Sequence, residues 1–185
     1  MNRLLINLII LLASGALLVA AFLLAPSFLE QLTPRTHLET ALRAPDLALI
    51  NLEDASFRSQ NHRGEILALL FWTSWNPAAA DAVLELDRLI RNGDLPDTAV
   101  VAINSQEAPD AVRTFLARAA IGIPVYLDAD GAAGEAYALG PLPLTVIVDR
   151  AGLIAYRHAG PLDAAALARA IAPLRDSQKI EYNNP

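Results

Sequence analysis

The chain opens with a long apolar segment. Between Arg3 and Glu30 no residue carries a charge, and the residues from Leu4 to Ala25 are almost all apolar. A stretch of that length can cross about 30 Å of hydrocarbon as one α-helix. We therefore predict a transmembrane anchor in residues 1–25. The competing interpretation is a cleaved signal peptide, but signal peptides have apolar regions of roughly 7–15 residues and a small-residue cleavage site.

The charge that precedes this apolar segment predicts its orientation. Arg3 and the terminal amine favour a cytoplasmic N-terminus and an exported domain. The bias is small, because Arg35, His37 and Arg43 follow on the other side. We expect a single-pass protein of the cell membrane that contacts the lipid bilayer through residues 4–25. Its domain is then extracytoplasmic, on the periplasmic or outer face.

A linker is expected between the anchor and the domain. We interpret residues 26–44 as juxtamembrane linker, because they have neither the length of an apolar span nor the pattern of a folded core. Its leucines could lie along the bilayer surface or a partner helix, and a simple spacer with local helix explains them as well. These leucines are Leu29, Leu32, Leu38 and Leu42.

Residues 45–175 alternate between short apolar runs and segments of helical period. Such alternation is typical of a sheet that helices cover on both faces. Apolar runs predict strands at 46–52, 66–72, 98–104, 124–128, 144–149 and 153–158, with turns at 128–131 and 149–152. Periodicity predicts helices at 76–93, 108–120 and 162–174. The polar residues 176–185 are expected to form a loose tail.

Local chemistry marks both ends of the helix that follows the strand at 66–72. Asn76 is a favoured N-cap residue, and Pro77 suits the first helical position. Gly93 offers a stop, because glycine adopts the left-handed conformation that ends many helices. The sequence therefore predicts that this helix begins directly after Asn76.

Composition removes several classes of function. The chain of 185 residues contains no cysteine, so it cannot form a disulfide, a thiolate nucleophile, a thiolate zinc site or an iron–sulfur site. The net charge of −6 comes without a clustered basic face, which argues against a nucleic-acid partner. In an exported compartment cysteines normally form disulfides, so their complete absence indicates loss.

Two stretches of the domain resemble a known family. APDLALINLEDASFRSQNHRGEILALLFWTSW is similar to the opening hairpin and first central strand of the membrane-anchored thioredoxin-like proteins of the TlpA type, which overlap with the redoxin and peroxiredoxin group. IPVYLDADGAAGEAYALGPLPLTVIVDRAGLIAYRHAGPLD is similar to the second half of that family. The resemblance runs from Ala44 to Leu174. It implies a thioredoxin-like α/β fold in which a central mixed sheet is flanked by helices.

The resemblance places the reactive cysteines of that family at positions that hold other residues here. Phe-Trp-x-x-Trp leads there into Cys-x-x-Cys at a helix start, and those cysteines fall on Asn76 and Ala79. The family's buried Asp or Asn falls on Leu70, and its Glu falls on Ala82. In the Thr-x-x-Cys frame of the peroxiredoxin branch, which begins at Thr73, the cysteine position is again Asn76. The resemblance therefore implies a scaffold that has lost its thiols together with the proton acceptors that served them.

A proline marks the second side of the former active site. Pro143 matches the family's cis-proline, which faces the reactive loop. One interpretation is a groove in which the Leu142 backbone pairs with an extended peptide, opposite Trp75 and Pro77. The alternative is that Pro143 only shapes the approach to the last hairpin. The candidate interaction face comprises Trp75, Asn76, Pro77, Leu142 and Pro143.

The other polar and aromatic residues give no reason to expect a metal or another cofactor. The three histidines, His37, His62 and His158, lack a second ligand at metal spacing. Trp72 belongs to an apolar strand and is expected in the core, whereas Trp75 is expected at the surface. Three aspartates at turns are expected to bond to the backbone: Asp128, Asp130 and Asp149.

Three functions stay open at this point. The first is a redox-inactive module, not an enzyme, that docks onto a membrane-protein partner as accessory subunit or assembly factor of a membrane complex. The second is the thiol–disulfide exchange or peroxide removal of the family, which without sulfur would depend on a partner's cysteines. The third is the binding of a peptide or small ligand in a vacated groove between Trp75, Ala79 and Pro143.

Overall fold

The computed structural model describes residues 42–181 of the chain, with side chains through Arg175. The expected anchor, most of the expected linker and His37 therefore lie outside the described residues. None of the helices within residues 42–181 combines the length and the apolar character needed to cross a bilayer.

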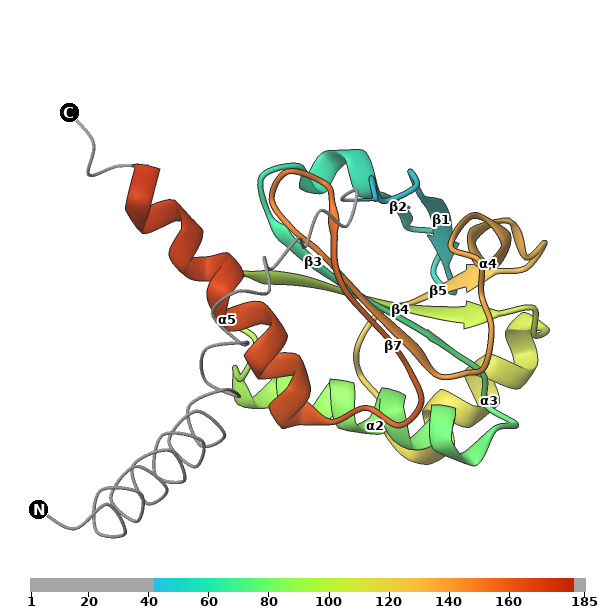
Figure 1. The fold of residues 1–185 in the computed structure, drawn as a ribbon. Coiled ribbons are helices and arrows are strands. Elements are labelled where there is room, and N and C mark those ends of the chain that lie inside the picture. The colour runs from blue at the N-terminus through green and yellow to red at the C-terminus, as the bar shows by residue number, and fades with distance from the viewer. Residues whose placement is uncertain (1–41, 182–185) are drawn as a thin grey trace, which may run out of the picture. The chain divides into compact units, whose positions relative to one another are not determined.

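Seven strands form one mixed sheet in the order β2-β1-β5-β4-β3-β6-β7 (Figure 1). The neighbours β3, β4 and β5 run parallel, and the other pairs run antiparallel. The strands are β1 (Ala48–Asn51), β2 (Ser56–Arg58), β3 (Ile66–Trp72), β4 (Thr98–Ser105), β5 (Val125–Asp128), β6 (Leu144–Val148) and β7 (Ile154–Ala159). The predicted central mixed sheet is confirmed.

Helices lie on both faces of this sheet. As a consequence β3 is buried along its whole length, and its side chains alternate between two core clusters. One cluster contains Leu70 and Trp72 and packs against α2 (Pro77–Asn92), α3 (Pro109–Ala119) and α5 (Ala164–Glu181). The other contains Phe71 and packs against the β1–β2 hairpin and α4 (Ala132–Ala136). A 3-10 turn, η1 (Ser59–His62), precedes β3.

The ends of α2 follow the predicted chemistry. Asn76 is its N-cap, Pro77 is its first residue, and Gly93 follows its last turn with a φ of 73°. The Gly93 amide N–H donates to the Ile90 carbonyl, which satisfies one of the free carbonyls at the helix end. Two neighbouring residues, Asn76 and Pro77, therefore set the start of α2, and Gly93 sets its end.

The structure corrects the prediction of a loose tail from Asp176. Helix α5 continues to Glu181, past Pro173. The segment that follows Leu174 contains no glycine or proline before Pro185, and it includes the good helix formers Gln178 and Lys179. The polar composition of this segment was therefore not a sign of disorder.

The expected linker also ends earlier than predicted. The Ala44 amide donates to the Gly152 carbonyl at 2.9 Å, and the Ile154 amide donates to the Leu42 carbonyl at 2.8 Å. An isolated bridge joins Arg43 to Leu153 between them. Residues 42–44 thus belong to the edge of the sheet. This backbone pairing leaves no hydrophobic pattern in the sequence.

Candidate functional site

Asn76, at the first of the two cysteine positions implied by the resemblance, caps α2. Its Oδ1 accepts hydrogen bonds from the amides of Ala78 at 3.0 Å and Ala79 at 3.3 Å. Asn76 itself has extended backbone, with φ −92° and ψ 115°, as an N-cap residue should. The amide side chain therefore satisfies two of the free amides at the N-terminus of this helix.

The nitrogen of the same side-chain amide bonds to a second loop. Asn76 Nδ2 donates to the Leu142 carbonyl at 3.1 Å, and the Leu142–Pro143 peptide bond is cis. The structure thus brings the α2 start and the loop before β6 together, as the resemblance implied. It also shows that the Leu142 carbonyl, which we expected to be free for an extended peptide, already accepts a hydrogen bond from within the chain.

The other three positions at which the resemblance implies site residues are packed into the core. Ala79 is 0% exposed, and Leu70 and Ala82 are 2% and 3% exposed within the same apolar cluster. Ala79 is therefore closed to solvent and cannot line a ligand groove. The prediction that a small-ligand groove lies between Trp75, Ala79 and Pro143 is wrong in this respect. No titratable side chain stands at any of these positions. The site cannot take up or release a proton there.

Glu107, which the sequence analysis did not single out, holds the loop before α2 in place. Its Oε2 accepts from the Ser74 amide at 2.7 Å and from Asn104 Nδ2 at 2.6 Å, and its Oε1 accepts from Ser74 Oγ at 2.5 Å. A carboxylate with three donors is well suited to fix two loops relative to each other. The available signal was a lone acidic residue directly after the strand at 98–104, which is also typical of an ordinary helix start.

The two tryptophans have opposite environments, as expected. Trp72 is 0% exposed and packs against Phe115, with ring centroids 5.4 Å apart. Trp75 is 71% exposed. The indole of Trp75 is therefore the large aromatic surface that the loop before α2 presents to solvent.

The turn aspartates make the backbone contacts that were predicted. Asp128 accepts from the Ala133 and Gly134 amides at 2.9 and 2.8 Å and so holds the start of α4, a helix that the sequence did not predict. Asp130 and Asp149 accept from amides two residues further on. These bonds explain the three carboxylates without catalysis.

The two histidines of the described region lie in different elements. His62 belongs to η1, stacks on Phe57 with centroids 5.1 Å apart, and lies 2.8 Å from a Glu65 oxygen. His158 lies in β7 beside Tyr156. Among residues 42–181, no cluster of three or more His, Asp or Glu side chains is placed to hold a metal ion.

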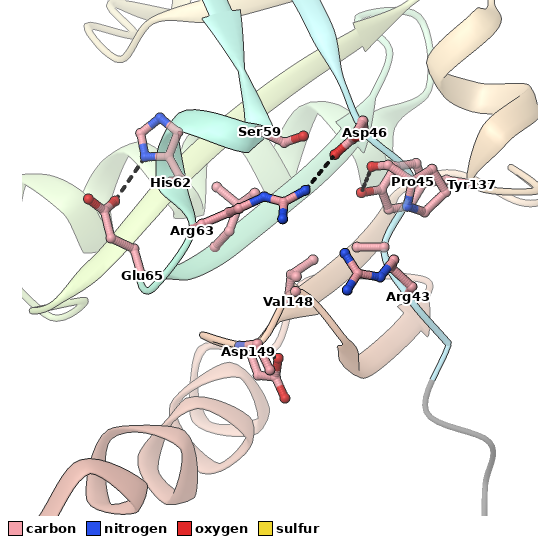
Figure 2. Close-up of a pocket in the computed structure, with 14 residues that line it drawn as sticks. Arg43, Pro45, Asp46, Ser59, His62, Arg63, Glu65, Tyr137, Val148 and Asp149 are labelled. Carbon is pink, nitrogen blue, oxygen red and sulfur yellow. Dashed lines mark hydrogen bonds and ion pairs between the residues drawn. The ribbon is translucent and has the colours of Figure 1, made fainter.

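A small pocket lies at the opposite end of β3, beneath the segment that leads into β1. Figure 2 shows its polar lining, in which His62 faces Glu65 and Arg63 reaches toward Asp46 at 4.0 Å. Its volume of about 50 Å³ has room for a few water molecules. Seven strand residues, or roughly 20 Å, separate this pocket from the α2 start.

Tyr137 closes one side of that pocket. Its hydroxyl donates to the Pro45 carbonyl at 3.0 Å, which ties α4 to the start of the domain (Figure 2). Burial, helped by the nearby negative charge of Asp46, raises the pKa of Tyr137 to about 12. The phenol therefore stays protonated, and its role is structural.

The chain is similar in sequence to several proteins of known name. It is 27% identical over 122 residues to thiol-disulfide oxidoreductase ResA of Geobacillus thermodenitrificans, covering 66% of this chain and 70% of the relative. It is 25% identical over 154 residues to ResA of Bacillus cereus, covering 83% and 86% of the two chains. The fold is similar to that of a candidate thiol:disulfide interchange protein DsbE from Chlorobium tepidum, with a TM-score of 0.66, 24% identity and coverage of 72% and 96%.

These similarities agree with the resemblance that the motifs implied. The relatives are named for thiol–disulfide chemistry, whereas this chain has no cysteine. The sequence profile of the AhpC/TSA family matches residues 41–157, which include β1 to β6 and the start of α2. Because that match spans well over half of the 185 residues, the chain belongs to the AhpC/TSA family.

Proposed function

We propose that this protein is a redox-inactive thioredoxin-like module that docks onto a membrane-protein partner, as accessory subunit or assembly factor of a membrane complex. The observation that carries the proposal is the state of Asn76. Its Oδ1 caps α2 and its Nδ2 binds the Leu142 carbonyl, so both ends of the side chain have structural partners. An amide cannot attack a disulfide or a hydroperoxide.

The neighbours of Asn76 support the same proposal. Leu70, Ala79 and Ala82 are packed in one apolar cluster, so the surroundings have been rebuilt as core. A single recent loss of a cysteine would have left the proton acceptors in place. The fold is retained without the cysteines that redox chemistry needs, and a rigid fold of this kind can still bind a partner.

The tether is part of the proposal. Residues 4–25 would span the bilayer with the N-terminus in the cytoplasm, which places the domain on the extracytoplasmic side. The partner would then be a protein of the same membrane or of the compartment outside it.

Purification of the full chain at native abundance in mild detergent tests this function. We expect a defined partner to co-purify in a constant ratio through two chromatographic steps. A monomer without partner at native abundance would contradict the proposal.

A second candidate follows from the names of the relatives. They are called thiol-disulfide oxidoreductases, and this chain could assist such exchange by holding a substrate polypeptide while a partner supplies both thiols. Insulin reduction and hydroperoxide turnover by the full chain with its co-purified partner separate the two candidates. Activity that needs both proteins supports the second candidate, and its absence supports the first.

A further inference from the structure

The loop before α2 presents an apolar strip. Trp75, Pro77 and Pro141 are exposed, and Leu142 is half-buried. The hydrogen bond from Asn76 Nδ2 to the Leu142 carbonyl holds the two loops that carry these residues side by side. An exposed indole within such a strip has the residue type and setting of an interface hot spot.

Two more loops lie beside this strip at the same edge of the sheet. Because β3, β4 and β5 are parallel neighbours, the loops that follow them meet at one edge. Glu107 binds Ser74, and the Gln106 amide donates to the Asp128 carbonyl at 3.0 Å. The loops after β3, β4 and β5 are therefore linked in one row.

This row is acidic. Residues 73–76, 106–110 and 129–131 contain no Lys, Arg or His, and they contain the acidic rim, which we define as Glu107, Asp110 and Asp130. Asp110 and Asp130 are exposed. Arg113 pairs with Asp110 at 2.8 Å and also donates to the Leu52 carbonyl.

We propose that Trp75 and the acidic rim together form the docking site for a basic segment of the partner protein. This inference rests on the proposed function and names the chemistry of its partner. A Lys or Arg side chain can lie over the indole face while the rim carboxylates attract neighbouring cations. Because Asn76 already donates to the Leu142 carbonyl and the exposed groups of this surface are side chains, the proposed contacts are made through side chains.

Other occupants fit this surface less well. An anionic bilayer surface and a nucleic acid would both be repelled by the rim. A second copy of this chain carries a net charge of −6 and would meet like charge. A basic protein segment is the occupant that satisfies both the indole and the carboxylates.

Fluorescence quenching measures the charge around Trp75. The chain has two tryptophans, of which Trp72 is fully buried, so Trp75→Phe isolates the exposed signal. When each quenching constant is divided by that of free N-acetyltryptophanamide, caesium should quench Trp75 more strongly than iodide, by roughly twofold or more at low salt. Asp110→Asn with Asp130→Asn should abolish this preference, whereas the matched neutralisation of Glu53→Gln with Asp94→Asn should keep it. Equal or stronger quenching by iodide would overturn the proposal.

Photo-crosslinking of the full chain in its native membrane identifies the occupant. p-Benzoylphenylalanine replaces the exposed Ala111 beside the rim, and replaces the exposed Leu84 on α2 as the control position. We expect Ala111 alone to crosslink, to a peptide of net positive charge, with a yield that falls about tenfold in Trp75→Ala. Crosslinking to an acidic or neutral peptide, to lipid or to a second copy overturns the proposal.

The two levels of inference fail differently. If a partner co-purifies but crosslinks only from position 84, the docking site is wrong and the proposed function stands. If no partner co-purifies at all, both are wrong. Raising the salt concentration from about 0.05 M to about 0.5 M should release a partner held through the rim, because exposed charges are screened. A complex that does not dissociate as the salt concentration rises would contradict the acidic docking site but not the proposed function.

Discussion

The side-chain amide of Asn76 joins the first turn of α2 to the carbonyl of Leu142, 66 residues further along the chain. Its Nδ2 lies 3.1 Å from that oxygen, and its Oδ1 accepts from two helix amides. Asn76, at the position where the resemblance implies a cysteine, is thus a structural link between the start of α2 and the loop before β6. This contact suggests that the loop persists because it holds the domain together.

Two substitutions of Asn76 should measure separately how much its cap and its bond to Leu142 contribute to stability. Asn76→Ala removes the cap and the bond to Leu142 and should lower the free energy of unfolding by about 2 kcal/mol. Asn76→Asp keeps a capping oxygen and removes only the donor, so its loss should be about 1 kcal/mol. Denaturant unfolding of the compact unit of residues 40–185 measures both.

Asn92→Ala is the control for these variants. Asn92 is exposed at the other end of α2, with one long contact of 3.4 Å to Asp94, and its replacement should change stability by less than about 0.5 kcal/mol. Equal stability of Asn76→Ala and the wild type would show that the link between the two halves contributes nothing.

Removing the Glu107 carboxylate should loosen the loop before α2. Glu107→Ala leaves the Ser74 amide, the Ser74 hydroxyl and Asn104 Nδ2 without their acceptor, at a cost of about 2–3 kcal/mol. Hydrogen exchange at the Ser74 amide should accelerate at least about tenfold. Glu107→Gln should have an effect between those of the wild type and Glu107→Ala. Its side-chain oxygen can still accept hydrogen bonds, but its NH₂ group faces another donor where the second carboxylate oxygen was.

Glu135 provides the matched control for Glu107. It is exposed in α4, and none of the side-chain bonds within residues 42–175 involves it. Glu135→Ala should leave Ser74 exchange unchanged. If both variants slow or quicken Ser74 exchange alike, the effect comes from charge in general and not from the Glu107 bonds.

Much of the fold could be predicted from local sequence. The unbroken apolar run at 66–72 predicted β3, and Asn76, Pro77 and Gly93 predicted both ends of α2. Each of these signals involves residues within one turn or one strand of each other. The burial of Trp72 and the exposure of Trp75 followed from the same local patterns.

The contacts that define the site were beyond such local signals. Ser74 and Glu107 lie 33 residues apart, and nothing near either residue indicates their bond. Helix α4 has only five residues and depends on the carboxylate of Asp128 to hold its first amides. Its short alanine-rich sequence carries no amphipathic period, so a turn was the natural expectation.

A buried hydroxyl offers a stabilising substitution. Thr145 is 3% exposed, pairs with Leu70 across β3 and β6, and its Oγ1 has no hydrogen-bond partner among the described residues. Thr145→Val keeps the shape and removes the unsatisfied oxygen, so it should raise the free energy of unfolding by about 1 kcal/mol. A destabilised Thr145→Val would mean that the hydroxyl has a partner, such as a bound water.

Alkaline pH should weaken the domain through Tyr137. Its pKa is raised from 10.0 to about 12 in the folded state, so the contribution of the protonated phenol is complete below pH 10. Between pH 10 and about 12 the unfolded phenol ionises while the folded one does not, and stability falls by up to about 2–3 kcal/mol. Stability measured across this range should fall less steeply in Tyr137→Phe. Parallel curves would contradict the shift.

Restoring sulfur tests how much of the relatives' site survives. Asn76→Cys with Ala79→Cys places thiols at the start of α2, and we expect them to form a disulfide if their Cα atoms lie within about 4.4–6.8 Å. Reduction of insulin by this variant should remain weak, because Leu70 and Ala82 cannot exchange protons. Mass measurement before and after alkylation detects the bond. Fast turnover would show that the apolar replacements do not limit the chemistry.

The absence of redox activity is the central claim, and turnover by the cysteine-free chain tests it most directly. The full-length protein, freed of its partner, is incubated with insulin and dithiothreitol and, separately, with a hydroperoxide and a dithiol, each beside the same mixture without the protein. The account predicts rates equal to those of buffer alone for both reactions. A rate above buffer that scales with the concentration of the protein would contradict it.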